Sequence, residues 1–129
     1  MCIGKNAKRL QICFGVPFFN VYDEKSNSCE VAVRGNINVI AKNYEKFLKK
    51  NGYSDTSLFT FEKELKSAII PCVKQAVSTA PKRYRQQCNT LDRKTKQIAK
   101  DIKSDLSKKL KKRYKVKLLD IEITAIECI

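Results

Sequence analysis

The stretch that decides the fold is YKVKLLDIEITAIE, residues 114–127, which follows directly on a lysine-dense segment. At about Val116 the spacing of apolar residues changes from the three- and four-residue intervals of a helix to the two-residue interval of a strand. Polar residues fill the alternate positions, which predicts a strand with one face on the core and one face in water. On the core face we expect Leu119, Ile121, Ile123 and Ala125, and on the solvated face Asp120, Glu122 and Thr124.

Two further strands are predicted near the start of the chain. Residues 11–23, QICFGVPFFNVYD, are rich in aromatic and β-branched residues, and Pro17 predicts an edge position or an irregularity. Residues 29–41 alternate between apolar and polar side chains, and a bulge or a close neighbour would explain Gly35 within them. The short polar turn between the two segments predicts an antiparallel hairpin. Because a hairpin leaves much of its apolar face uncovered, we expect the strand after Val116 to join it.

Helices are predicted between the second and third strands. The first is expected over residues 44–51, with Asn43 as its N-cap. The second begins near Thr60 and carries apolar residues at three- and four-residue intervals, the pattern of a helix with one buried face. Pro71 predicts a kink in it or a break into two segments, because proline removes a backbone hydrogen bond inside a helix.

A third helix is expected after a loop over residues 78–87, with Asn89 or Thr90 as its cap. Its apolar stripe covers one face only, so this helix is expected to lie on the surface of another layer. The elements together predict an α+β domain in the order β-β-α-α-α-β, with helices packed on one side of a small, mainly antiparallel sheet. The stripe consists of Leu91, Ile98, Ile102, Leu106 and Leu110.

Charge is the strongest compositional feature. The chain has 27 Lys and Arg against 13 Asp and Glu, a formal net charge of +14, and most of the excess lies between residues 82 and 117. Such a basic stripe attracts polyanions, either nucleic acid or an anionic membrane leaflet. A solvated helix face that serves no partner is the alternative. The candidate residues for contact with an anionic surface are Lys94, Lys96, Lys100, Lys103, Lys108, Lys109, Lys111, Lys112 and Arg113.

Six cysteines and no histidine limit the chemistry that the chain can perform. The cysteines lack CxxC spacing and several fall on apolar positions, so we expect buried thiols rather than a disulfide framework. Without histidine, Cys–His nucleophile pairs and mixed Cys/His zinc sites are excluded. Asp120 and Glu122 fit the solvated side of an edge strand better than a pair of catalytic carboxylates. We therefore expect no catalytic residue, metal, cofactor or small-molecule substrate, and an enzyme with a lone nucleophilic cysteine is the weakest alternative.

Five segments together resemble the SPFH domain, also called the Band 7 or prohibitin-homology domain, and most closely its bacterial virion-core-like members. In that family an Asp-Pro-x-x-Phe sequence opens a helix, and Asn43, Tyr44 and Phe47 stand in its place here. The resemblance covers residues 10–129 as a single domain, with residues 1–9 as an N-terminal extension, and suggests a piece cut from a longer protein. The segments are FGVPFFNVYD, VAVRGNINV, KNYEKFLKKNG, FEKELKSAII and YKVKLLDIEITAIE.

The resemblance implies a non-enzymatic, membrane-associated scaffold module that self-associates. It implies a cytoplasmic chain at the periphery of a membrane, held there through segments that flank the domain. No apolar run approaches the roughly 20 residues needed to cross a bilayer, and the N-terminus lacks the layout of a signal peptide. The alternative function is nucleic-acid binding through the lysine-rich helix, residues 94–117, although aromatic residues for base stacking are scarce there. The candidate contacts with a membrane or a second copy are Phe14, Val16, Phe18 and Phe19.

Overall fold

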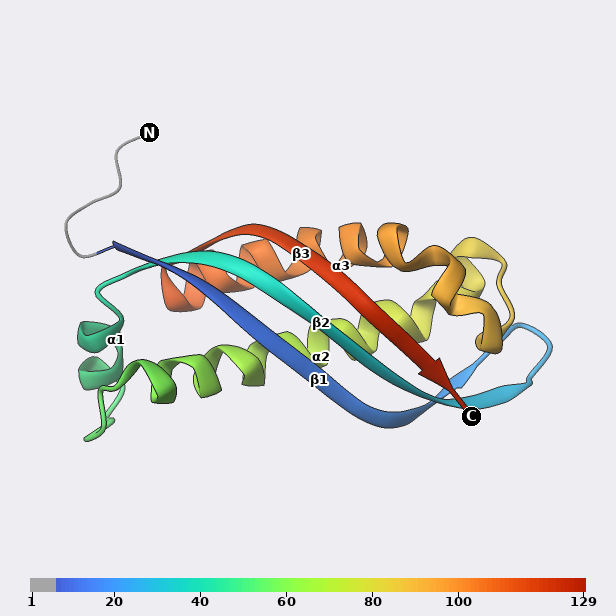
Figure 1. The fold of residues 1–129 in the computed structure, drawn as a ribbon, viewed down its shortest axis with the longest axis horizontal. Coiled ribbons are helices and arrows are strands. Elements are labelled where there is room, and N and C mark those ends of the chain that lie inside the picture. Colours follow the sequence, from blue (N-terminus) through green and yellow to red (C-terminus); the bar gives the residue numbers. More distant parts are fainter. Residues whose placement is uncertain (1–6) are drawn as a thin grey trace.

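Three antiparallel strands form one open sheet in the computed structural model, which describes residues 7–129. The central strand β2 pairs with β1 along one edge and with β3 along the other, which confirms both the predicted hairpin and the joining of the last strand. Figure 1 shows the long strands crossing in front of the helices. The strands are β1 (Ala7–Tyr22), β2 (Ser28–Lys42) and β3 (Val116–Cys128).

The two long helices lie side by side behind one face of the sheet, whereas a short helix lies at one end of the molecule (Figure 1). The hydrophobic core fills the space between the sheet and the long helices. The α+β class and the β-β-α-α-α-β order predicted from the sequence are confirmed. The helices are α1 (Tyr44–Lys50), α2 (Leu58–Tyr84) and α3 (Thr95–Lys109), and α3 is flanked by the helical turns η1 (Cys88–Lys94) and η2 (Leu110–Tyr114).

Two bulges in β3 change which of its side chains face the core. The pairing with β2 passes over Leu119 and Thr124, so each stands as an extra residue. Leu118 rather than Leu119 is therefore buried, and Ala125 lies opposite the exposed Arg34 on the open face of the sheet. The predicted core positions of Leu119 and Ala125 are wrong because each extra residue reverses the two-residue alternation of a strand.

Helix α2 is continuous over 27 residues and begins slightly earlier than expected. Ser57 is its N-cap, and its hydroxyl oxygen accepts a hydrogen bond from the Thr60 amide at 3.3 Å. The helix continues through Pro71, which is exposed, so the proline does not divide it into two segments. An exposed position suits proline, because its ring and the carbonyl that it leaves unpaired then face water.

The loop predicted over residues 78–87 is wrong, since α2 extends to Tyr84 and contains Pro81 as well. The reason is the packing of the last turns, whose small apolar side chains extend the buried stripe of the helix. Burial of this stripe stabilises the helix against the local cost of a second proline. The buried residues of these turns are Ala76, Val77, Ala80 and Pro81.

Neither of the predicted side-chain caps is found among the described residues. Asn43 has a left-handed backbone, with φ at 51°, and makes no side-chain hydrogen bond to α1. Asparagine tolerates this conformation, so Asn43 turns the chain from β2 into α1. The third helix begins only at Thr95, after η1, and the Thr90 hydroxyl donates instead to the Gln87 carbonyl oxygen at 3.1 Å.

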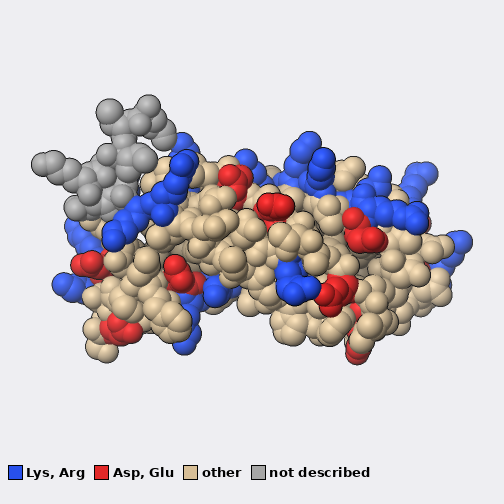
Figure 2. All heavy atoms as spheres, in the orientation of Figure 1, with Lys and Arg blue, Asp and Glu red and all other residues tan. Residues whose placement is uncertain are grey.

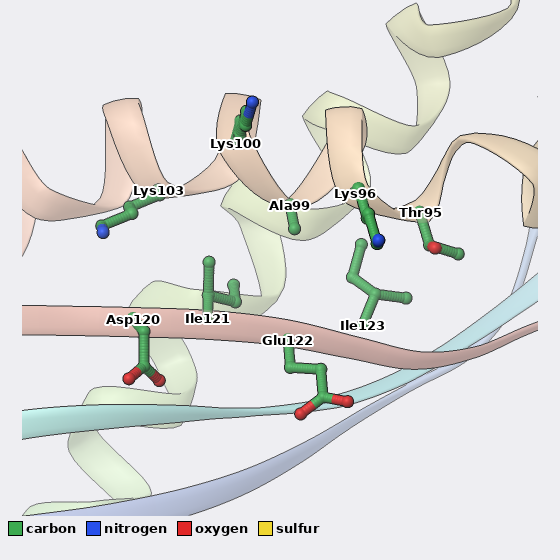
Figure 3. A pocket seen from close by; sticks show the side chains of 9 residues that line it. All are labelled: Thr95, Lys96, Ala99, Lys100, Lys103, Asp120, Ile121, Glu122 and Ile123. Carbon is green, nitrogen blue, oxygen red and sulfur yellow. The ribbon is translucent and has the colours of Figure 1, made fainter.

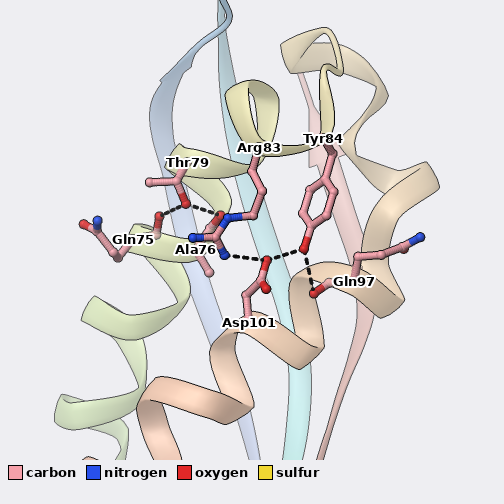
Figure 4. A network of polar contacts seen from close by, with 7 residues as sticks. All are labelled: Gln75, Ala76, Thr79, Arg83, Tyr84, Gln97 and Asp101. Atoms are coloured by element: carbon pink, nitrogen blue, oxygen red, sulfur yellow. Dashed lines mark hydrogen bonds and ion pairs between the residues drawn. The ribbon is translucent and has the colours of Figure 1, made fainter.

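A polar network joins the end of α2 to the first turns of α3 (Figure 4). The Asp101 carboxylate accepts hydrogen bonds from the Tyr84 hydroxyl and from the Arg83 guanidinium, the latter with an N–O distance of 3.0 Å. Burial of the Tyr84 hydroxyl and its bond to this carboxylate raise the pKa of Tyr84. The network therefore links the C-terminal turn of α2 to α3.

Gly35 lies where β2 is crowded from both sides. A Cβ atom at this position would lie 2.7 Å from Cζ of Phe14 and closer still to the carbonyl oxygen of Glu122. Both explanations suggested by the sequence therefore apply, because a bulge of β3 also lies beside Gly35. The glycine allows the ring of Phe14 to fill the core directly above the strand.

We predict that Gly35→Ala lowers the free energy of unfolding by about 1–3 kcal/mol, because the added methyl group must displace backbone or ring atoms. Gly15→Ala is the matched control, since a Cβ atom there would meet nothing within 4 Å, and its effect should stay within about 0.5 kcal/mol. Urea denaturation of both variants measures the difference. Equal stability of the two would contradict the packing described around Gly35.

Candidate functional site

Helix α3 presents its lysines to solvent because its apolar stripe faces the sheet. All five residues of the stripe predicted from the sequence are at most 1% exposed. The basic residues on the remaining face are exposed from Lys96 to Arg113, and Lys94 is half-buried. Figure 2 shows basic side chains along the upper edge of the molecule, where α3 runs, and at the end that holds α1.

Five of the nine predicted basic residues line one or the other of two separate hollows. Lys96, Lys100 and Lys103 line a groove between α3 and β3. Lys112 and Arg113 line a second hollow, which lies between α1 and η2 and which we call the basic hollow. The other predicted residues line neither one: Lys94, Lys108, Lys109 and Lys111.

The basic hollow has a volume of about 600 Å³, and no acidic residue is among those that line it. Its lysines come from segments that are far apart in the chain. Lys46 and Lys50 share one face of α1 through their four-residue spacing, Lys42 ends β2 beside them, and the left-handed residue Lys115 ends η2. The basic residues of the lining are Lys42, Lys46, Lys50, Lys112, Arg113 and Lys115.

Sequence reasoning missed the α1 side of this hollow. The four-residue spacing of Lys46 and Lys50 within the predicted helix was visible, and it indicates two like charges on one face of that helix. The sequence did not indicate that these charges would face Lys112 and Arg113, because that contact depends on the tertiary fold.

Tyr114 lies in the wall of the basic hollow with its ring in the core. The ring centroids of Tyr114 and Phe47 are 5.2 Å apart. The guanidinium carbon of Arg113 lies 5.3 Å from the ring centroid of Tyr114. The residue is 2% exposed, and within the described part of the chain its buried hydroxyl has no hydrogen-bond partner. A buried hydroxyl without a partner costs about 1–3 kcal/mol of stability. The fold therefore keeps a polar atom here at a cost.

The apolar candidates for a membrane or self-association contact do not form one surface. Phe14 and Val16 are 4% and 2% exposed, so their prediction as contact residues is wrong. Strand alternation turns both side chains toward the helices, and the irregularity after Val16 turns Phe18 outward, where it is 45% exposed. Phe19 is half-buried, with the Lys74 ammonium 5.8 Å from its ring centroid.

The acidic residues of β3 lie on the open face of the sheet, as predicted. Asp120 and Glu122 are exposed, and Asp120 accepts a hydrogen bond from the Asn38 side-chain amide at 2.6 Å. Among residues 7–129, no cluster of three or more histidine, cysteine or acidic side chains could hold a metal ion. No helix in the same range is long and apolar enough to cross a membrane.

We predict that Tyr114→Phe raises the free energy of unfolding by about 1 kcal/mol or more, because it removes a buried hydroxyl that lacks a partner. Tyr84→Phe is the control, because it removes a hydroxyl that donates to Asp101 and should lower stability. Thermal and urea unfolding of both variants test the prediction. A loss of stability in Tyr114→Phe would show that the hydroxyl is paired in solution.

Comparison with known proteins assigns no family to this chain. No protein-family model matches the sequence, and no curated protein is significantly similar to it. The resemblance to the SPFH domain therefore rests on the sequence pattern alone.

Proposed function

We propose that the chain is a non-enzymatic module that binds an anionic membrane surface through the basic hollow and acts there as a scaffold of the SPFH type. The observation that carries the proposal is the lining of the basic hollow, with six basic residues and no acidic one. Each lysine or arginine held near an anionic leaflet contributes about 1 kcal/mol of attraction. A concave site of this charge is suited to the phosphate groups of lipid headgroups.

A second feature at the same end of the molecule supports a membrane over another polyanion. Phe59 is 68% exposed in the first turn of α2, which begins beside α1 (Figure 1). The Lys63 ammonium lies 5.5 Å from its ring centroid. An exposed aromatic ring beside lysines is typical of surfaces that insert shallowly among lipid headgroups.

Nucleic-acid binding through the lysine-rich helix, residues 94–117, is less well supported. Single-strand binding needs exposed aromatic rings on which bases stack. Tyr114 is buried and Tyr84 is half-buried with its hydroxyl bound to Asp101, so neither offers a free ring face. Lysine contacts to the phosphates of a duplex stay as the alternative, and the experiment below includes them.

We predict that the protein sediments with vesicles of phosphatidylcholine and phosphatidylserine, and not with phosphatidylcholine alone. Lys46→Glu with Lys112→Glu should lower the affinity at least about 30-fold, since two attractions of about 1 kcal/mol are lost. The control is Lys82→Glu with Lys108→Glu, which changes the net charge equally at exposed positions outside the basic hollow. Vesicle co-sedimentation at several salt concentrations gives the affinities, and sedimentation velocity on the vesicle-free protein tests self-association.

An equal loss in both double variants would show that net charge alone drives binding, and the proposed site would then be wrong. Binding to duplex DNA without binding to vesicles, at the same ionic strength, would favour the nucleic-acid alternative. A strictly monomeric protein at high concentration would count against self-association through this domain.

A further inference from the structure

The groove between α3 and β3 follows the free edge of the sheet. β3 is the last strand in the order β1-β2-β3, so its outer edge pairs with no other described strand. The groove has a volume of about 440 Å³. In Figure 3, Ile121 and Ile123 point toward α3 and the small side chain of Ala99 points back at them, so the floor is apolar.

The backbone of β3 in this groove is oriented to accept another strand. The carbonyl oxygen of Glu122 lies against β2, because it is the nearest atom to a Cβ placed on Gly35. Successive residues of a strand direct their amide and carbonyl groups to opposite edges. The groups of Ile121 and Ile123 therefore point to the free edge, beside the apolar floor.

Charge differs between the two sides of this edge. Figure 3 shows Lys96 and Lys103 extending from α3 along the groove, whereas Asp120 and Glu122 point away from it toward the open face. The side chains that an added strand directs toward α3 would therefore meet lysines. The side chains that it directs toward the open face would meet carboxylates.

We propose that this groove binds an extended acidic segment of a partner protein, which adds to the sheet as a fourth strand along β3. Main-chain hydrogen bonds to the edge supply affinity in such complexes, and the pockets for alternate side chains supply specificity. On the helix side, the segment places an apolar side chain on the floor between two acidic side chains that face Lys96 and Lys103. Its alternate side chains, beside Asp120 and Glu122, are neutral or basic.

The spacing of the lysines agrees with this arrangement. Seven residues along a helix span about 10 Å, and four residues along a strand span about 13 Å, a difference that two flexible lysine side chains accommodate. A second copy of this chain fits the edge poorly. Pairing β3 with β3 would bring the lysine rows of two α3 helices together, and like charges in contact oppose association.

The probe that tests the proposal is a fluorescent heptapeptide of sequence Thr-Glu-Thr-Val-Thr-Glu-Thr, followed by anisotropy. Lys96→Glu with Lys103→Glu should lower its affinity at least about tenfold, since charge reversal turns two attractions into repulsions. Lys108→Glu with Lys109→Glu is the matched control on the same helix, outside the groove, and should change the affinity less than about threefold. Ala99→Leu fills the floor and should also abolish binding.

Hydrogen exchange distinguishes strand addition from charge attraction alone. Bound peptide should slow the exchange of the Ile121 and Ile123 amides, because they gain hydrogen bonds. The control peptide Thr-Thr-Glu-Glu-Val-Thr-Thr has the same composition without the two-residue period and should bind at least about tenfold more weakly. No binding, equal binding of the two peptides, or unchanged exchange in β3 would each overturn the proposal.

An independent observation concerns two cysteines that meet at the opposite end of the sheet from α1. Cys29, at the start of β2, and Cys88, at the start of η1, have their sulfur atoms 2.7 Å apart although 59 positions separate them in the chain. A disulfide joins sulfur atoms at about 2.05 Å, so a small movement would link them. Cys29 is half-buried and Cys88 is 3% exposed. Burial and the contact with Cys29 raise the pKa of Cys88 to about 11, so Cys88 is protonated at neutral pH.

We infer that Cys29 and Cys88 form a disulfide when the chain meets a disulfide oxidant such as oxidised glutathione. Cys29, whose pKa is lowered by the contact with Cys88 but raised overall by burial and by its neighbour Cys128, gives up its proton, and its thiolate then attacks the glutathione disulfide and releases one reduced glutathione. Cys88 then gives up its proton and attacks the Cys29 sulfur of the mixed disulfide, releasing the second glutathione. Two thiols are oxidised, one glutathione disulfide is reduced, and the two thiol protons leave with the two glutathione molecules. The link would close a loop that contains most of β2 and the whole of α2. It would therefore restrict the conformations of the unfolded chain.

Peptide mapping after treatment with oxidised glutathione should show a Cys29–Cys88 link, together with a rise in melting temperature that dithiothreitol reverses. Cys29→Ser and Cys88→Ser should each lose both effects, whereas Cys13→Ser, at an exposed position, should keep them. Cys128 also lies near Cys29 and could form a disulfide with it in place of Cys88. A link from Cys29 to Cys128, or no link, would overturn the inference.

Discussion

The pairing of β3 with β2 is the interaction on which the rest of the structure depends. The β1–β2 hairpin offers one apolar face, and two strands alone are too narrow to cover two antiparallel helices that lie side by side (Figure 1). β3 widens the sheet to three strands, and α3 packs chiefly against it. The apolar stripe of α3 is buried between this strand and α2. The lysines of α3 are in turn held on the outside because the stripe is held on the inside.

The same pairing explains why one edge of the sheet carries a groove. Two bulges adapt β3 to the twisted surface of β2, and between them Ile121 and Ile123 keep a regular alternation facing the helix. Opposite them α3 carries Ala99, whose small side chain leaves the space that a larger residue would fill. Edge strands are usually protected by charge. Here Asp120 and Glu122 protect the open face, and the lysines of α3 flank the other side.

How much of this could be predicted from the sequence depends on the range of each interaction. The stripe of α3 and the alternation in β2 are local patterns, and they gave the correct elements, their order and the fold class. Bulges at Leu119 and Thr124 could not be seen, because they depend on how one strand fits another. Pro81 inside α2 misled the prediction for a similar reason, since tertiary burial of its neighbours outweighs its local preference. The exposed basic face of α3 could be predicted from the sequence. That basic residues of α1 and η2 would line one hollow together could not.

The two basic regions differ in what their presence implies. Lysines on α3 are the expected consequence of an amphipathic helix in a lysine-rich chain, and they need no functional explanation. The basic hollow is different, because it brings six like charges to one concave site, and Tyr114 in its wall has a buried hydroxyl without a partner among residues 7–129. Packing does not require this arrangement: Leu48 anchors α1 in the core, and neutral residues at positions 46 and 50 would leave that contact intact. Features that oppose stability without serving the core are concentrated where proteins bind their partners. The hollow is therefore the stronger indication of function, although the lysine-rich helix is the more conspicuous feature of the sequence.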